Sequence, residues 1–128
     1  TPGVNIGLFC STPMVALSRN VNKKSAMEML LTGDMINAEK AKEIGLINDY
    51  FETEKLTDET MILANKIASK SAMTVSMGKG AFYAQSELDL PEAYEYTSKV
   101  MIENIQKEDA KEGIGAFIEK RSPEWGDK

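Results

Sequence analysis

The sequence predicts a mostly α-helical fold. Apolar residues recur at helical spacing over most of the 128 residues, and capping residues or prolines precede several of these stretches. Only one stretch, 46–51, has the composition of a strand. Hydrophobic residues make up 42% of the chain and charged residues 27%, which is typical of a globular domain and not of a disordered chain. The length suits one domain or part of one.

Short helices are expected in the first half of the chain. A proline and two glycines within 1–7 argue against a regular helix there and favour a loop or a strand exit. Pro13 suits the first position of a helix that follows a cap at Ser11 or Thr12. Asn37 is the predicted cap of another helix, and Gly45 supplies the left-handed residue that ends it. The expected helices cover 13–19, 23–31 and 38–44.

Four longer helices are expected after the strand candidate. Thr57 is the predicted cap of the first, because Asp58 and Glu59 then lie at the positive end of its dipole and Leu63 and Ile67 form its apolar face. The next should run over 72–86, with an apolar stripe along it. The stripe consists of Met73, Met77, Ala81, Ala84 and Leu88. Pro91 in a first turn and Asp109 as an opening residue predict the last two helices, which end near 106 and 120.

The solitary strand candidate raises a question about the chain itself. A lone strand cannot satisfy its backbone donors and acceptors. Residues 46–51 therefore pair either with a second copy of the chain or with strands that lie upstream. The chain begins Thr1-Pro2-Gly3 without a methionine, which fits ordinary processing or a piece of a longer protein.

Composition excludes several chemistries within the chain. There is no histidine, so a serine or cysteine nucleophile with a histidine base and a histidine-ligated zinc are both excluded. The single cysteine, Cys10, cannot form an internal disulfide or a thiolate metal site, which fits a reducing compartment. The net charge of −5 disfavours binding to nucleic acid. No apolar run is long enough to span a membrane, so no membrane association is expected.

Few residues stand out as chemical groups on their own. Most carboxylates lie on expected exposed helix faces, where the prediction is a solvated surface: Glu39, Glu43, Asp58, Glu59, Glu87, Glu103 and Glu112. Cys10 is better explained as an inert buried thiol than as a nucleophile. Phe117 and Lys120 lie three apart near the end of the last helix, a pairing that suits an adenine ring and a phosphate. Ordinary packing and capping explain the same two residues.

Several segments together resemble the crotonase superfamily, the enoyl-CoA hydratase/isomerase family. The resemblance runs through 26–38 (AMEMLLTGDMINA), 41–47 (AKEIGLI), 64–68 (ANKIA) and 112–121 (EGIGAFIEKR), in the order and with the spacing of the family. The opening 1–13 (TPGVNIGLFCSTP) is similar to one subgroup. The resemblance implies the C-terminal part of the α/β crotonase fold, a ClpP-like spiral of ββα units. Residues 1–51 would end the spiral core, and 52–128 would form a helical oligomerisation domain that drives trimerisation.

The resemblance also implies what the protein binds. Its ligand would be an acyl-CoA thioester, with coenzyme A as part of the substrate and no separate cofactor or metal. Phe117 and Lys120 match the family's residues near the CoA adenine and phosphate, and the full-length protein would be a homotrimer or hexamer. The family's oxyanion hole would lie upstream of Thr1. The location would be the cytoplasm in a bacterium and the mitochondrial matrix in a eukaryote.

One position departs from the family pattern. Hydratases carry a glutamate after a proline, and here Gly3 follows Pro2. Glycine cannot transfer a proton, so no catalytic residue is intact in the chain and the 128 residues alone are expected to be inactive. Two functions remain: a nominal hydratase or isomerase of fatty-acid metabolism, and a non-catalytic CoA-binding or oligomerisation scaffold. If only the acid is missing, Gly3→Glu should create or raise activity.

Overall fold

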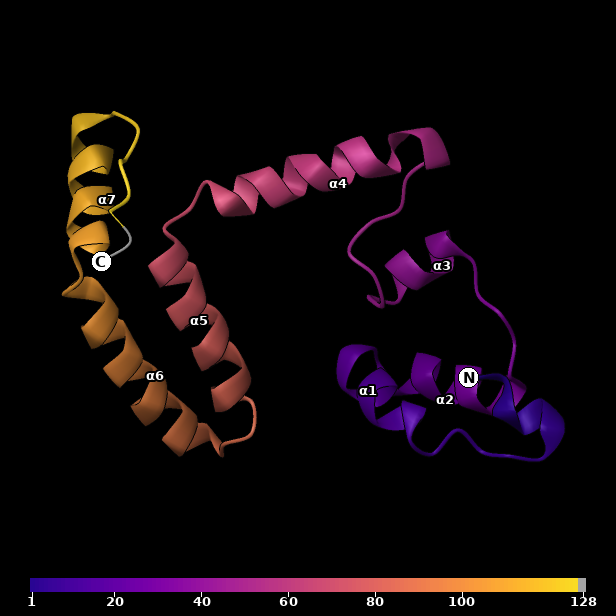
Figure 1. Ribbon diagram of the computed structural model, residues 1–128. Coiled ribbons are helices and arrows are strands. Elements are labelled where there is room, and N and C mark those ends of the chain that lie inside the picture. The colour runs from indigo at the N-terminus through magenta and orange to yellow at the C-terminus, as the bar shows by residue number, and fades with distance from the viewer. Residues whose placement is uncertain (127–128) are drawn as a thin grey trace. The chain divides into compact units, whose positions relative to one another are not determined.

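The computed structural model describes residues 1–126 and consists of helices joined by short connections (Figure 1). In chain order these are the 3-10 helix η1 (Pro2–Ile6) and the α-helices α1 (Pro13–Asn20), α2 (Lys23–Thr32), α3 (Ala38–Glu43), α4 (Thr53–Ala68), α5 (Ala72–Gln85), α6 (Leu90–Ile105) and α7 (Glu108–Glu119). The predicted mostly α-helical fold is confirmed.

The start and stop residues of the short helices follow the expected chemistry. The Asn37 side chain accepts a hydrogen bond from the Lys40 N–H at 2.8 Å and so caps α3. Gly45 follows α3 with φ of 80°, the left-handed conformation predicted for it. Thr12 occupies the capping position of α1, but its side chain makes no capping hydrogen bond. Pro13 alone therefore marks that helix start locally, through its fixed φ.

Two predicted helix starts and one predicted loop differ from the structure. Thr57 does not cap a helix, because α4 begins four residues earlier at Thr53, with Glu54 as the acidic residue in its first turn. Both starting points place a carboxylate at the positive end of the dipole, so the charge pattern alone does not separate them. The loop expected over 1–7 contains η1. Asp109 is the second residue of α7, which begins at Glu108.

The predicted strand at 46–51 does not form, and no strand occurs within residues 1–126. The N–H groups of Leu46 and Ile47 instead donate to the carbonyl oxygen of Ala41, at 2.8 and 3.4 Å, and close the end of α3. The Asp49 carboxylate accepts the Tyr50 N–H at 2.9 Å. With no neighbouring strand among the described residues, the backbone satisfies part of its hydrogen bonding locally.

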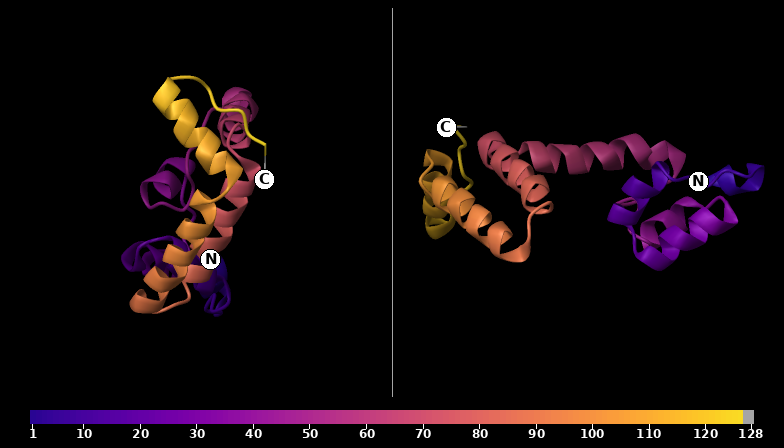
Figure 2. Two further views of the ribbon diagram at one scale, coloured as in Figure 1. Left: turned by 90° about the vertical axis from the view of Figure 1, so that its left-hand side faces the viewer. Right: turned by 90° about the horizontal axis from the view of Figure 1, so that it is seen from below.

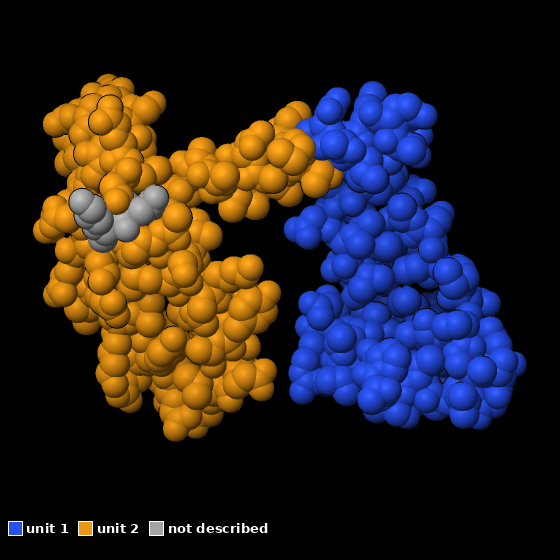
Figure 3. Space-filling model, in the orientation of Figure 1, with its two compact units in different colours: residues 1–59 blue, residues 60–128 orange. Residues whose placement is uncertain are grey.

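The chain divides into two compact units, residues 1–59 and residues from 60 onward, which Figure 3 distinguishes by colour. The division falls inside α4. The boundary expected after residue 51 rests on the family resemblance and stays a prediction. The last two residues of the expected second domain, 127 and 128, lie outside the described part of the chain.

The first unit has a small apolar core between α1 and α2. Leu17, Val21, Ala26 and Leu30 are its buried members. The 3-10 helix η1 lies against α2, where the Asn5 side-chain amide donates to the Gly33 carbonyl at 3.3 Å. Gly33 has φ of 67°, and a Cβ there would lie 2.8 Å from the Asn5 amide. Glycine therefore suits both the end of α2 and the close approach of η1.

The second unit is built on α5 and α6, which lie side by side in Figures 1 and 2. Buried Ala81 and Ala93 carry small side chains that permit this close packing. The predicted apolar stripe on α5 is correct only in part: Met73 and Met77 are half-buried and Ala81 is buried, but Ala84 is exposed. The stripe ends there because α5 stops at Gln85, so Leu88 lies beyond the helix. In α4, no residue is buried, and Leu63 and Ile67 are exposed.

Candidate functional site

Gly3 is enclosed by its own loop. Its N–H donates to Cys10 Sγ at 3.3 Å, and its carbonyl oxygen accepts the Leu8 N–H at 2.9 Å. A Cβ at Gly3 would lie 2.7 Å from the Leu8 carbonyl oxygen and 2.8 Å from Cys10 Sγ. Any side chain at this position therefore requires the backbone of the loop to move.

Cys10 contributes to packing and to this loop. The residue is half-buried and contacts the apolar core of the first unit, and its sulfur accepts the Gly3 N–H. No histidine exists in the chain to serve as a base. These contacts favour the structural interpretation of the thiol over the nucleophilic one.

The carboxylates divide into exposed and enclosed groups. Glu39, Glu43, Asp58, Glu87 and Glu103 are exposed, as predicted, whereas Glu59 and Glu112 are half-buried. Asp109 is buried, and its Oδ1 accepts the Gly126 N–H at 2.8 Å. Among residues 1–126 no group of three potential metal ligands gathers.

The end of α7 presents the two residues that the sequence singles out. Phe117 is 84% exposed. Because α7 ends at Glu119, Lys120 lies just outside the helix and not on its face, which corrects the expected placement. The Lys120 N–H donates to the Phe117 carbonyl at 3.3 Å and the Arg121 N–H donates to the Ala116 carbonyl at 3.0 Å. This is the Schellman arrangement that commonly ends helices.

Lys120 adopts the left-handed backbone conformation, with φ of 56° and ψ of 38°. It is the one non-glycine residue with positive φ among residues 1–126. An L side chain in this conformation costs about 1–2 kcal/mol, and glycine usually occupies the position. A lysine there means that neighbouring contacts offset the cost.

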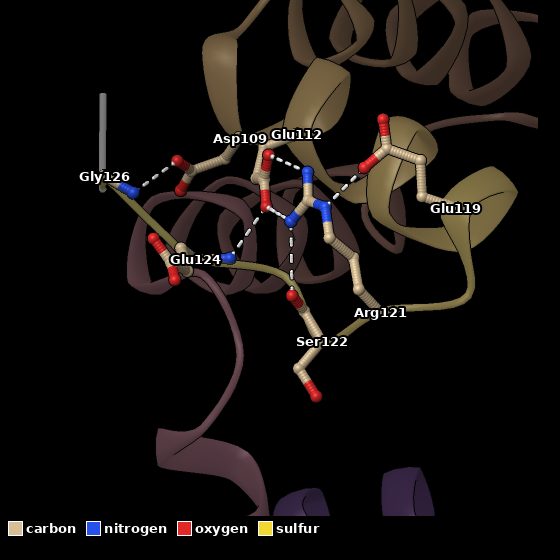
Figure 4. A network of polar contacts seen from close by, with 7 residues as sticks. All are labelled: Asp109, Glu112, Glu119, Arg121, Ser122, Glu124 and Gly126. Atoms are coloured by element: carbon tan, nitrogen blue, oxygen red, sulfur yellow. Dashed lines mark hydrogen bonds and ion pairs between the residues drawn. The ribbon is translucent and has the colours of Figure 1, made fainter.

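Arg121 supplies such contacts (Figure 4). Its Nη1 and Nη2 donate to the two carboxylate oxygens of Glu112 at 2.6 and 2.9 Å, and its Nε donates to Glu119 at 2.6 Å. The Glu124 N–H donates to the same Glu112 carboxylate at 2.8 Å. The hydrogen bonds from Arg121, followed by the one from Glu124, lower the pKa of Glu112 to about 2, and the hydrogen bonds to Glu112 and Glu119 raise the pKa of Arg121.

A pH-dependent contribution to stability follows from this ion pair. The pKa of Glu112 is depressed from 4.5 to about 2 in the folded chain. A depressed carboxylate pKa stabilises the fold above the unfolded value and ceases to do so as pH falls through the folded value. Glu112→Gln should therefore lower the melting temperature near neutral pH, with the difference shrinking between about pH 4.5 and pH 2. Thermal unfolding at a series of pH values tests this, and a difference constant from pH 7 to pH 2 would contradict it.

A groove lies beside this helix end within the second unit. It encloses about 640 Å³ and is lined mainly by apolar side chains of α5, α6 and α7 together with Trp125. Phe117 forms part of the lining, and Trp125 Nε1 donates to the Ser69 carbonyl at 2.9 Å. An exposed aromatic ring thus joins an apolar groove, and the lysine follows directly after the same helix.

Comparison with known proteins identifies the family of the chain. Residues 1–128 match the family profile described as enoyl-CoA hydratase/isomerase. The chain belongs to the enoyl-CoA hydratase/isomerase family. The resemblance identified in the sequence is confirmed over the full length of the chain.

Among the relatives in this family, several carry one name. The chain is 51% identical over 125 residues to mitochondrial enoyl-CoA hydratase domain-containing protein 3 of mouse, and 51% identical over 125 residues to the human protein. Each alignment covers 98% of this chain, but only 42% of the mouse protein and 41% of the human protein. It is also 39% identical over 112 residues to the mitochondrial enoyl-CoA hydratase of Pongo abelii, covering 88% of this chain and 39% of that relative. The chain thus spans about two fifths of the length of these family members.

Crystal structures from the family have the same fold. The enoyl-CoA hydratase of Mycobacterium smegmatis matches with a TM-score of 0.93 at 47% identity, over 98% of this chain and 49% of that one. Human enoyl-CoA hydratase domain-containing protein 3 matches with a TM-score of 0.90 at 51% identity, over 98% and 49%. The chain therefore has the fold of the C-terminal half of these family structures. None of the described helices is long and apolar enough to span a membrane.

The predicted site residues belong to different units, and the structure shows further residues that the sequence did not single out. Gly3 belongs to the first unit, whereas Phe117 and Lys120 belong to the second. Sequence reasoning missed Arg121 as the partner of Glu112, and it missed the buried state of Asp109. Glu112 and Arg121 are nine residues apart, and Arg121 lies beyond the end of α7. The pair is therefore not a neighbouring pair on a helix face, and no local pattern identifies it.

Proposed function

We propose that the protein containing this chain binds an acyl-CoA thioester, with Phe117 against the adenine and Lys120 against a phosphate of coenzyme A. The observation that carries the proposal is the end of α7, where an aromatic ring that is 84% exposed precedes an exposed lysine. No carboxylate among residues 1–126 forms an ion pair with that lysine. An ammonium group of this kind suits a phosphate, and an exposed ring suits a planar base.

The proposal assigns no hydration step to this chain. The position of the family's second glutamate is Gly3, which has neither a proton to give nor an oxygen to receive one. The loop also leaves no room for a Cβ at Gly3. The protein is thus a hydratase or isomerase by family, and its hydratase activity by the two-glutamate route is proposed to be absent.

A non-catalytic role is the second candidate, and the enclosure of Gly3 is the observation that favours it. The tight contacts around Gly3 indicate a loop built for glycine and not a loop from which an acid has merely been removed. In this alternative only the CoA-binding or oligomerisation scaffold remains. The two candidates differ in turnover and agree in fold.

Assembly into a homotrimer or hexamer is part of the proposal. Large apolar side chains on α5, α6 and α7 are more than half exposed: Phe82, Tyr83, Tyr94, Met101, Ile102, Ile105, Ile114 and Ile118. Exposed apolar surface of this extent is typical of protein interfaces. The mitochondrial names of the eukaryotic relatives support a mitochondrial location for a eukaryotic source, for which the matrix is the proposed compartment, and the cytoplasm is the proposed location for a bacterial source.

The test uses the protein at its native length. Calorimetry should show binding of coenzyme A, and crotonyl-CoA should be hydrated far below the rates of about 1–1000 per second that are common for enzymes. Hydration within that range would contradict the conclusion drawn from Gly3. Absence of CoA binding would contradict the roles of Phe117 and Lys120 and would favour the oligomerisation scaffold.

A further inference from the structure

Lys120 lies at a sharp reversal of the chain. Lys120 has positive φ, and the next residue turns back along α7. Where the ammonium lies therefore depends on whether this reversal is held in one geometry. In a flexible tail, the same lysine would sample many positions and would lose rotamer and backbone entropy on binding.

Arg121 ties the reversal to α7 at two points. Glu119 is the last residue of the helix, and Glu112 lies two turns earlier on it. The guanidinium joins both, with a two-pronged contact to Glu112 at 2.6 and 2.9 Å and a contact to Glu119 at 2.6 Å. The planar fork of arginine makes this contact directional, so it determines the course of the chain directly after Lys120.

The returning segment is held further along as well. The Glu124 N–H donates to Glu112 and the Gly126 N–H donates to Asp109, each at 2.8 Å. Trp125 Nε1 donates to the Ser69 carbonyl at 2.9 Å. Residues 121–126 thus run back along α7, as the close-up in Figure 4 shows for this network.

We propose that Arg121 is a positioning residue that acts through Lys120: by binding Glu112 and Glu119 it holds the left-handed turn and so presents the Lys120 ammonium to a phosphate of coenzyme A. This inference rests on the proposed function. It assigns to Glu112 the same task from the other side of the ion pair.

The charges around Arg121 separate this role from direct binding. One guanidinium faces two carboxylates, and its Nη1 also donates to the Ser122 carbonyl at 3.2 Å. The group of three side chains therefore carries a net negative charge, which does not attract an anionic ligand. Loss of Glu112 would favour an anion by simple electrostatics, and it would weaken binding if the ion pair positions Lys120. The two explanations predict opposite signs.

The test is a double-mutant cycle on the native-length protein, with coenzyme A as the probe in calorimetry. Arg121→Ala should weaken binding about fivefold in the presence of Lys120, and it should have no effect in a Lys120→Gly background, because coupled residues are not additive. Glu112→Ala should also weaken binding about fivefold. Equal losses in both backgrounds, or tighter binding by Glu112→Ala, would overturn the inference.

A second measurement does not depend on the ligand. Hydrogen exchange of the Lys120 and Arg121 amides should accelerate in Arg121→Ala, because both amides bond to α7 only while the turn is held. Unchanged exchange would overturn the positioning role. If Lys120→Gly itself binds coenzyme A as tightly as the original protein, the proposed role of Lys120 fails, and the inference fails with it. A loss in Lys120→Gly combined with additivity at Arg121 would overturn the inference alone.

Discussion

Gly3→Glu is expected to destabilise the protein by about 1–3 kcal/mol and to leave crotonyl-CoA hydration unrestored. The Cβ of the new residue would lie 2.7 Å from the Leu8 carbonyl oxygen and 2.8 Å from Cys10 Sγ. The first of these atoms belongs to the backbone, so relief requires the loop to open and the 2.9 Å hydrogen bond from Leu8 N–H to Gly3 to break. An opened loop does not hold a carboxylate in one place for proton transfer.

Gly3→Ala is the matched control, since it introduces the Cβ without the carboxylate. It should lower the free energy of unfolding by a similar amount, measured by denaturant titration. If only the acid were missing, as the sequence alone allows, Gly3→Glu would gain activity at unchanged stability. That result would show that the loop accommodates a side chain at residue 3 without strain.

Lys120→Gly is expected to have the largest effect on ligand binding, a loss of about tenfold in affinity for coenzyme A. A hydrogen bond between charged groups contributes about 1.5–3 kcal/mol, and each 1.4 kcal/mol corresponds to a factor of about ten. Glycine adopts positive φ without strain, so the same substitution should stabilise the fold by about 0.5–1 kcal/mol. Calorimetry and thermal unfolding measure the two effects separately.

Lys120→Ala provides the comparison for that pair of measurements. It removes the ammonium but retains a Cβ at φ of 56°. The affinity should fall as in Lys120→Gly, whereas the gain in stability should be absent. Equal affinity of all three proteins for coenzyme A would return Lys120 to a purely structural role at the end of α7.

Much of the helical architecture could be predicted because its signals are local. Asn37 caps α3 through its own side chain, and Gly45 ends the same helix through its own φ. The family could be identified for a related reason: its motifs are contiguous residues such as 112–121. Thr57 shows where local signals fail, since the acidic residues after it predict a helix start there, whereas α4 begins at Thr53.

The candidate site depended more on tertiary contacts. Phe117 and Lys120 could be named from the sequence, but the end of α7 before Lys120 could not, because a lysine gives no signal for the left-handed conformation. Arg121 pairs with Glu112 only after the chain reverses, so the pair follows from the turn and not from the helical repeat.

The sequence by itself determined the mostly helical fold, the family and the absence of a carboxylate at residue 3. These features follow from composition, from helix caps and from motifs, all of which depend on residues that are close together in the sequence. Only the tertiary structure decided that Leu46 and Ile47 close the end of α3 where a strand was expected, that the loop excludes a Cβ at Gly3, and that Arg121 binds Glu112 and Glu119 beside Lys120. These outcomes depend on which backbone partners and side chains meet in space, and no local pattern encodes such meetings.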